Sequence, residues 1–582
     1  MALTHLQILA KRYPNVQAVL AELAHLEAVL TLPKPTVHVV SDVHGEDVKL
    51  RQVVNNASGS LRPMFERLFA VRLSIEPRPH AGALTAGDEP RSSSAEIEQL
   101  LTLVYYPQET WTVMVAGVAP ERRRALLHWV TASGAIVLRE LVRHYSLRYV
   151  ARIVPDPFDG VFHELVFADE LARQPTFLDG LLEPFLRHER DGELVRAIAH
   201  VIRNLAVGEL VVAGDLGDRG PRIDRVIDVI AQQPNVAITW GNHDANWMAA
   251  CLGHPAAIAT VIRLSLRYQR LAQLEDGYGI SLEPVARLAR EAYGDDPAAC
   301  FGVKGEAGAD ALRLARMQKA IAILQFKLEG QAFERRPEWG LAHRALLRRI
   351  DPATGTIEID GARYPLRDTQ FPTVDWADPH ALSAGEASCL AELTQAFLAS
   401  RALWHQMSFV VSRGQMSVRR DLCAIFHGCV PVDEHGTPLA FVVDGEPRAG
   451  KALFDAIERV VQRAFRKGGA AVAELDRDLV FYLWTGPLSP CFGKDRMATF
   501  ETYFVADPRT HEETKNPYFK LIHDAAFCGR ILVDFGVDPL AGFIINGHVP
   551  VKLEAGETPI KQSGRAITID GAFAAAYGDK GF

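Results

Sequence analysis

The sequence predicts an α/β protein whose core is two packed mixed sheets flanked by helices, with large, mainly helical insertions. Short apolar runs rich in β-branched residues recur along the chain and indicate buried strands. Long stretches with apolar residues at helical spacing separate these runs, and polar residues follow directly after several of them. Four strands predicted in this way are residues 37–40, 210–212, 236–239 and 543–545.

Length and composition limit the class of protein. A chain of 582 residues exceeds what one hydrophobic core usually serves, so it predicts more than one structural unit. With 48% apolar and 23% charged residues, the chain resembles an ordinary globular protein rather than a disordered or fibrous one. The formal net charge of -8 argues against binding to nucleic acid, which needs an extended cationic face.

The cysteines and the N-terminus indicate the compartment. Seven cysteines without CxxC spacing favour neither a disulfide framework nor a zinc ribbon, so we expect the reducing cytoplasm. Residues 6–30 predict one amphipathic helix that ends before Pro33. Charged residues interrupt its apolar positions, unlike the apolar centre of a signal peptide. Because no stretch approaches the length of a membrane span, we expect no membrane association.

The order of the patterns predicts one core that is interrupted twice. We expect a core in two parts, with an insertion at about residues 56–205 of the first part and a mainly helical insertion between the parts. The four expected segments are residues 1–35 (N-terminal helical), 36–250 (first core part), 251–400 (helical insertion) and 401–582 (second core part). Further helices are expected at residues 96–106, 121–145, 256–274 and 309–335, a hairpin at 356–364, and strands at 440–444, 479–485 and 542–545.

Five short motifs place polar side chains straight after apolar runs, where open α/β sheets carry their chemistry. A DxH motif alone is a weak signal and is better explained as a polar turn after a strand. The five motifs in this order together favour a metal site, because oxygen and imidazole donors that converge on one point are typical of a site for two metal ions. The motifs are Ser41-Asp42-Val43-His44-Gly45, GDLGDRG at residues 214–220, GNHD at 241–244, His427-Gly428 and Gly547-His548.

These motifs together resemble the calcineurin-like metallophosphoesterases, in the branch of the phosphoprotein phosphatases. The segments around them are similar to class III fructose-1,6-bisphosphatases over nearly the whole chain. These segments are AIAILQFKLEG at residues 320–330, FHGCVP at 426–431, FGKDRMATFE at 492–501, KNPY at 515–518, GHVPVK at 547–552 and IDG at 569–571. Arg496 stands where lysine is expected from that family, and members of the family usually continue with more strands beyond the position of Phe582.

The resemblance implies a metallophosphoesterase core that binds two divalent ions. Mn²⁺ is the first expectation, and Mg²⁺ or Fe fits the same donors. The expected ligands are Asp42, His44 and Asp215 for one ion, and Asp215, Asn242, His427 and His548 for the other. A hydroxide bridging the two ions would be the nucleophile, so no phosphoenzyme is needed.

Three further residues of these motifs have expected roles in catalysis. His243, oriented by Asp218, is the expected general acid for the leaving oxygen, although a structural imidazole is the alternative. Arg219 offers a planar fork to phosphate oxygens, with a surface salt bridge as its alternative. Further cations are expected to bind the substrate, although a solvated surface role suits each of them equally well. They are Lys494, Arg496, Lys515, Lys552 and Arg565.

The expected function is hydrolysis of the 1-phosphate of fructose 1,6-bisphosphate, giving fructose 6-phosphate and phosphate in gluconeogenesis. The resemblance also implies AMP or phosphoenolpyruvate as an effector, and a homo-oligomer. A phosphoprotein (Ser/Thr) phosphatase is the alternative within the hydrolases, because the central motifs alone fit it equally well. A catalytically silent, metabolite-binding regulator on the same scaffold is the alternative from another class.

Overall fold

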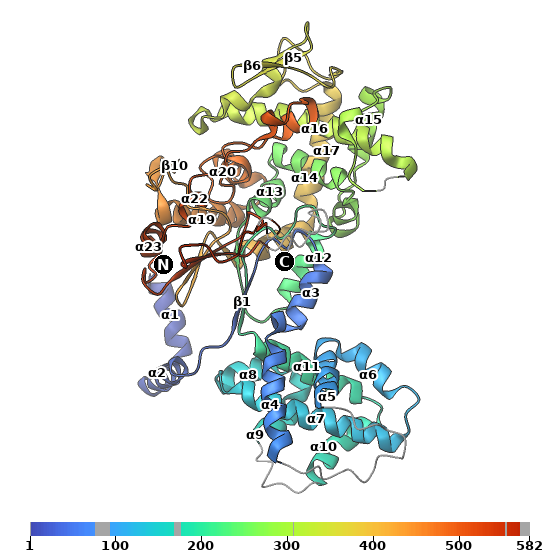
Figure 1. Cartoon of the computed structure of the whole chain (residues 1–582), viewed down its shortest axis with the longest axis vertical. Coiled ribbons are helices and arrows are strands. Elements are labelled where there is room, and N and C mark those ends of the chain that lie inside the picture. Colours follow the sequence, from blue (N-terminus) through green and yellow to red (C-terminus); the bar gives the residue numbers. More distant parts are fainter. Residues whose placement is uncertain are drawn as a thin grey trace. The chain divides into compact units, whose positions relative to one another are not determined.

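The computed structural model describes residues 2–75, 93–167, 176–305, 308–552, 554 and 556–570, and it is a mixed α/β structure with high helical content and several small sheets (Figure 1). It divides into two compact units. The first contains residues 1–38, 51–210 and 233–235, and the second contains residues 39–50, 211–232 and 236–582. The division into four segments expected from the sequence stays a prediction.

The first unit is built from helices around one apolar core. Buried Leu127, Leu138, Ile198 and Ile202 belong to this core, in which α7 packs on α11. The helices expected at residues 96–106 and 121–145 are confirmed as α5 and α7. The helices are α1 (Ala2–Arg12), α2 (Val16–Leu30), α4 (Leu61–Ile75), α5 (Ser93–Tyr105), α6 (Pro107–Val115), α7 (Pro120–Val142), α8 (Leu147–Ile153), α9 (Asp159–Phe167), α10 (Thr176–Arg187) and α11 (Asp191–Ala206).

One expectation for this unit is wrong, and the premise of another, that no stretch approaches the length of a membrane span, needs correction. The single helix expected at residues 6–30 is two helices, because Pro14 has no N–H to continue the first and the side chain of Asn15 caps the second by accepting from the Ala18 N–H at 2.8 Å. Helix α7 is also long and apolar enough, by length and composition alone, to cross a membrane. Half of its apolar window is buried, as in the core helix of a globular protein.

Two four-stranded sheets carry the loops of interest. The first has the order β1-β2-β3-β7, formed by Val37–Val40, Glu209–Val212, Val236–Thr239 and Gly414–Gln415. The second has the order β13-β12-β9-β8, formed by Ala566–Thr568, Phe543–Asn546, Cys423–Ile425 and Val418–Arg420. In the second sheet β12 is parallel to β13 and to β9, whereas β8 is antiparallel to β9. The strands expected at residues 37–40, 210–212, 236–239 and 543–545 are confirmed.

Helices fill most of the second unit. The helices expected at 256–274 and 309–335 are α14, which ends earlier at Arg267, and α16, and the expected hairpin is β5–β6. Helix α3 (Asp47–Asn55) has residues in both units, and the other helices are α12 (Ile223–Ala231), α13 (Asn242–Cys251), α14 (Pro255–Arg267), α15 (Glu283–Tyr293), α16 (Ala311–Arg335), α17 (Ala384–Ala399), α18 (Arg401–Ser412), α19 (Gly450–Lys467), α20 (Glu474–Thr485), α21 (Thr499–Phe504), α22 (Tyr518–Leu521) and α23 (Ala525–Asp534). The remaining strands are β4 (Ile350–Asp351), β5 (Thr356–Ile359), β6 (Ala362–Pro365), β10 (Phe441–Val443) and β11 (Glu446–Arg448).

The strand expected at residues 479–485 is wrong, because these residues form the C-terminal half of α20. All seven are buried, and α20 packs against α13 and α19. A short run of apolar residues that is buried on every side has no polar face, so its periodicity does not distinguish a strand from a helix.

Candidate metal centre

The predicted ligands come from loops that begin where strands end. Asp42 and His44 follow β1, Asp215 follows β2, Asn242 opens α13 after β3, and His548 follows β12. All five line one cavity of about 330 Å³ in the second unit. The sixth, His427, follows β9, is 1% exposed, and lies beside this cavity in contact with Asp215 and His548. The structure therefore brings all six predicted ligands together.

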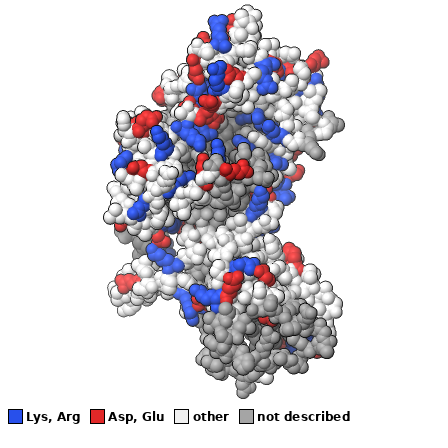
Figure 2. All heavy atoms as spheres, viewed as in Figure 1, with Lys and Arg blue, Asp and Glu red and all other residues white. Residues whose placement is uncertain are grey.

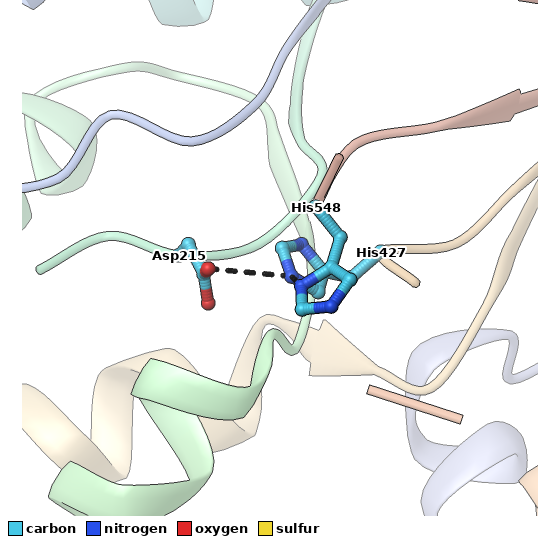
Figure 3. Close-up of side chains that lie close together, drawn as sticks. All are labelled: Asp215, His427 and His548. Carbon is cyan, nitrogen blue, oxygen red and sulfur yellow. Dashed lines mark hydrogen bonds and ion pairs between the residues drawn. The ribbon is translucent and has the colours of Figure 1, made fainter. Parts of the chain in front are cut away.

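Asp215, His427 and His548 form one cluster whose ligand atoms lie within 4.8 Å of one another. The Nε2 atom of His427 lies 3.3 Å from Asp215 Oδ2 and 3.2 Å from His548 Nδ1 (Figure 3). The Nδ1 atom of His427 lies 2.9 Å from the Ala213 carbonyl, which can only accept a hydrogen bond. Such a contact fixes the tautomer and leaves Nε2 directed at the cluster, as in histidines that ligate metals.

Charge coupling inside this cluster is strong. Burial alone would lower the pKa of His427, but the carboxylates of Asp215 and Asp42 raise it to about 10. Burial would likewise raise the pKa of Asp215, but His427 and His243 hold it well below its usual range. An imidazolium is therefore the counter-charge of this buried carboxylate when no other cation is bound.

Asp42, His44 and Asp570 form a second cluster of the same kind. Burial, followed by the neighbouring carboxylate of Asp570, raises the pKa of Asp42 well above its usual range. Burial also lowers the pKa of His44 to about 4, so this imidazole is neutral at neutral pH. Crowded carboxylates beside a neutral imidazole are what a divalent cation stabilises.

Asp570 was assigned no role from the sequence, although it obeys the rule that identified the other ligands. It follows the strand β13 after one residue, and its side chain is 2% exposed. The segment at residues 569–571 entered the prediction only through resemblance, and Gly571 lies outside the described residues. A polar residue straight after a buried strand was the signal that could have found Asp570.

Asn242 provides a test of whether a cation fits. Its side-chain Oδ1 is buried and has no hydrogen-bond partner among the described residues. An unsatisfied buried amide oxygen is costly, and coordination to a cation is one of the few ways to offset that cost. The oxygen and imidazole donors of both clusters, together with this amide, therefore suit divalent metal ions.

The backbone at these loops is strained where ligands are presented. Four predicted ligands have left-handed backbone conformations: Asp42 (φ 53°), His44 (φ 52°), Asp215 (φ 56°) and His548 (φ 70°). Each such non-glycine residue costs about 1–3 kcal/mol, and such costs concentrate at functional sites. Position 241, next to these ligands, requires glycine, because a Cβ atom on Gly241 would lie 2.1 Å from Asp215 Oδ1.

Asp244, the last residue of the GNHD motif, clamps two of these loops together. Its buried carboxylate accepts from the backbone N–H groups of Gly241 at 2.8 Å and of Asp215 and Leu216 at 2.9 Å each. The backbone N–H of His243 in turn donates to Asp215 Oδ1 at 3.1 Å. No role was expected for Asp244 from the sequence, because only the three-dimensional contacts reveal it.

The predicted general acid and its partner also lie together. His243 Nδ1 is 3.3 Å from Asp218 Oδ1, and Arg219 Nε is 3.1 Å from Asp218 Oδ2. The His243 ring packs edge-on against Trp484, with 4.8 Å between ring centroids, and lies 5.9 Å from the His44 ring. All three motif residues line the cavity, so the structure brings them to the predicted ligands.

The other predicted substrate-binding cations divide into two groups. Lys494 lines the cavity and pairs with Glu513 at 2.7 Å. Arg496 lies outside it and pairs with Asp360 at 2.6 Å. Three others do not line the cavity: Lys515, Lys552 and Arg565. On the face drawn in Figure 2, basic and acidic side chains are interspersed, so an anion depends on the cations that line the cavity.

Two arginines at this cavity were not predicted. Arg263 and Arg267 of α14 line it, together with Tyr268, which follows the helix. No local motif marks them, because two arginines four residues apart on a helix are ordinary in any sequence.

Comparisons with known proteins agree with these observations. A family described as Firmicute fructose-1,6-bisphosphatase matches residues 4–582. A curated relative from Listeria innocua is 38% identical over 98% of this chain and 86% of its own length. Relatives from Clostridium acetobutylicum (99% and 85%) and Fusobacterium nucleatum (98% and 86%) are each 36% identical. All three carry the name fructose-1,6-bisphosphatase class 3, and no solved structure matches the chain.

Proposed function

The chain belongs to the Firmicute fructose-1,6-bisphosphatase family, and we propose that its cavity removes the 1-phosphate of fructose 1,6-bisphosphate. The match over nearly the whole chain confirms the expected enzyme class, a phosphatase of the class 3 fructose-1,6-bisphosphatases. The observation that carries the proposal is the convergence of six predicted ligands from five separate segments on one buried site. Fructose 6-phosphate and phosphate are the products, and gluconeogenesis is the proposed setting.

The proposed cofactor is a pair of divalent ions in a metallophosphoesterase core built from the two four-stranded sheets. One ion is assigned to Asp42, His44, Asp215 and Asp570, and the other to Asp215, Asn242, His427 and His548. Divalent ions in such a site lower the pKa of water and neutralise charge on the phosphoryl group. Mn²⁺ remains the first prediction for their identity, with Mg²⁺ or Fe as alternatives.

The protein's own residues supply orientation and a proton. Asp218 holds Nδ1 of His243, so Nε2 is the atom that delivers a proton to the leaving oxygen on carbon 1. Arg219 is positioned by the other oxygen of Asp218 and binds oxygens of the reacting phosphate. Trp484, packed against His243, excludes water from one side of the ring.

A comparison of substrates tests this function. Purified protein is loaded with Mn²⁺, Mg²⁺ or Fe²⁺, and phosphate release is measured from fructose 1,6-bisphosphate and from a phosphoserine peptide. We expect a clear preference for the sugar bisphosphate with at least one metal, abolished by a chelator. A preference for the peptide would instead establish the phosphoprotein phosphatase alternative. Tight binding of AMP or phosphoenolpyruvate without any phosphate release would establish the silent regulator.

Compartment and assembly are proposals with separate support. All seven cysteines are unpaired, which supports the reducing cytoplasm. A homo-oligomer is supported by α2, which buries no residue and exposes Val16, Leu23 and Leu30 at heptad spacing. Sedimentation of the purified chain and of Leu23→Glu tests the oligomer, and a monomer in both would refute it. An AMP or phosphoenolpyruvate effector stays a prediction of the resemblance.

A further inference from the structure

The end of α14 brings two guanidinium groups to the cavity that contains the predicted metal ligands. Helix α13 begins with Asn242 and His243, and the chain bends by 119° between α13 and α14. This bend turns α14 back, so that Arg263 and Arg267 line the same cavity as the ligand loops. The side chain of Arg263 is only 3% exposed, and that of Arg267 is half-buried.

The contacts of these arginines are to neutral groups. Arg263 Nε donates to Gln325 Oε1 at 2.6 Å, and its Nη1 donates to the Tyr503 hydroxyl at 3.3 Å. The guanidinium of Arg267 lies over the Tyr503 ring, 4.9 Å from the centroid. Neither arginine forms an ion pair with a carboxylate of the described residues.

The other cations of the cavity differ in this respect. Arg219 pairs with Asp218 at 3.1 Å and Lys494 with Glu513 at 2.7 Å, so carboxylates already balance their charge. The nearest acid to Arg263 along its contacts is Glu329, which accepts from Gln325 Nε2 at 2.7 Å. Because a buried charge without a paired counter-charge is costly, the α14 end of the cavity favours an anionic ligand.

We propose that Arg263 and Arg267 bind the phosphate of the substrate that is not hydrolysed, the 6-phosphate of the sugar. The proposal rests on the proposed function, which places the 1-phosphate at the metal ligands. A guanidinium presents two parallel N–H donors that match two phosphate oxygens, and it stays charged at every working pH. Binding one phosphate at α14 orients the sugar so that the other phosphate faces His243, and it favours the bisphosphate over sugar monophosphates.

A network of hydrogen bonds holds Arg263 in place before any ligand arrives. The Tyr503 hydroxyl donates to Gln318 Oε1 at 2.8 Å, which leaves its oxygen to accept from Arg263. Gln318 Nε2 in turn donates to the carbonyl of Phe301 at 3.0 Å. A guanidinium fixed in this way loses little conformational entropy when it binds an anion. It therefore binds the phosphate more tightly than a mobile arginine would.

The test compares two substrates that share the reacting phosphate. Values of kcat/KM are measured for fructose 1,6-bisphosphate and for fructose 1-phosphate, with Arg267→Gln, Arg263→Gln and the metal-loaded parent protein. We expect each variant to lose about 10- to 100-fold on the bisphosphate, mainly through KM, because a charge-assisted contact is removed. Activity on fructose 1-phosphate should change by less than about 3-fold, since that substrate does not reach α14.

Controls separate the outcomes. Arg290→Gln on α15 removes an exposed arginine that pairs with Glu283 at 2.9 Å, and it should leave both substrates unchanged. Thermal unfolding identifies a variant that does not fold; Arg267 is the less buried of the two, so Arg267→Gln decides if Arg263→Gln unfolds. Equal losses on both substrates, or no loss on the bisphosphate, would overturn the proposal while leaving the proposed function intact. A parent protein inactive on both sugar phosphates would overturn the proposed function itself.

Discussion

The cavity is lined by two groups of residues that are built in opposite ways, called here the metal end and the arginine end. The metal end consists of loops after strands, and it gathers buried carboxylates and imidazoles from segments as far apart as Asp42 and Asp570. The arginine end consists of one helix, α14, whose Arg263 and Arg267 contact neutral partners. The excess of negative charge at the metal end suits divalent cations. The excess of positive charge at the arginine end suits an anionic group of the substrate.

The two ends are also held differently. At the metal end, four predicted ligands have strained backbone, and the Asp244 clamp joins the loops of Asp215 and Gly241. At the arginine end, a buried network anchors the start of α14: His254 caps the helix and lies 3.2 Å from Asp478, which also accepts from Arg335 at 2.8 Å. The difference teaches that the chemistry depends on local loop geometry, whereas recognition depends on the packing of a helix.

The largest expected effect is at the metal end. Asp215→Asn removes the carboxylate proposed to contact both ions, so both metals and about 10⁴-fold or more of the turnover should be lost. Elemental analysis and phosphate release measure this. Asp228→Asn, on the exposed face of α12, is the matched control and should retain both metals. Full metal content in Asp215→Asn would remove this residue from the ligand set.

The general acid should behave differently from the ligands. His243→Ala should keep both metals and lower kcat by about 10²- to 10⁴-fold, because a proton donor and not a ligand is removed. The same two assays distinguish these effects. If His243→Ala loses both metals, the imidazole is a ligand or a structural element rather than an acid.

Asp570 is a proposed ligand that was not predicted from the sequence. Asp570→Asn should weaken binding of the ion near Asp42 and His44 by about 10- to 100-fold, leaving one tightly bound metal per chain. Metal titration followed by calorimetry measures both affinities. Two unchanged affinities would show that this carboxylate serves only to balance charge.

The smallest effect on activity is expected at the anchor of the arginine end. Asp478→Asn leaves His254 and Arg335 without their buried carboxylate, and it should lower the free energy of unfolding by about 3 kcal/mol. Because α14 is only loosened, kcat/KM for the bisphosphate should fall by less than about 10-fold. Glu474→Gln, an exposed neighbour 3.6 Å from Arg335, is the control and should cost less than about 1 kcal/mol.

The loss of stability in Asp478→Asn should depend on pH. Burial would raise the pKa of Asp478, but hydrogen bonds from His254 and Arg335 hold it below its ordinary value. A carboxyl with a depressed folded pKa adds stability above its unfolded value of about 3.9, and that stability is lost as pH falls through the folded pKa. Denaturant unfolding should therefore show a constant difference between parent and variant at neutral pH and a shrinking one below about pH 4. A difference that grows on acidification would contradict the assignment.

The metal end was predictable from the sequence because its ligands are marked by a short, local sequence pattern. A buried strand followed by a polar residue identifies Asp42, Asp215 and His548 from the sequence, and the same rule would have added Asp570. The strands that carry these residues were predicted for the same reason. Residues 479–485 were misassigned because an apolar run buried on all sides has no period to reveal it as a helix.

The arginine end was not predictable because its meaning depends on distant contacts. Gln325 lies 62 residues from Arg263 along the chain, and Tyr503 lies 240 residues away. Conversely, Arg496 lies in a segment that resembles the family, yet it pairs with Asp360 outside the cavity. Sequence reasoning identifies a cation but not the direction in which it points, and that direction decides whether it binds substrate.

The most direct test of a cavity with these two ends is the product formed from fructose 1,6-bisphosphate. Phosphorus NMR of the metal-loaded protein with this substrate distinguishes fructose 6-phosphate from fructose 1-phosphate. We predict fructose 6-phosphate and free phosphate only, because the arginine end retains the 6-phosphate while the metal end cleaves the other. Release of fructose 1-phosphate, or no phosphate release with any divalent metal, would contradict this.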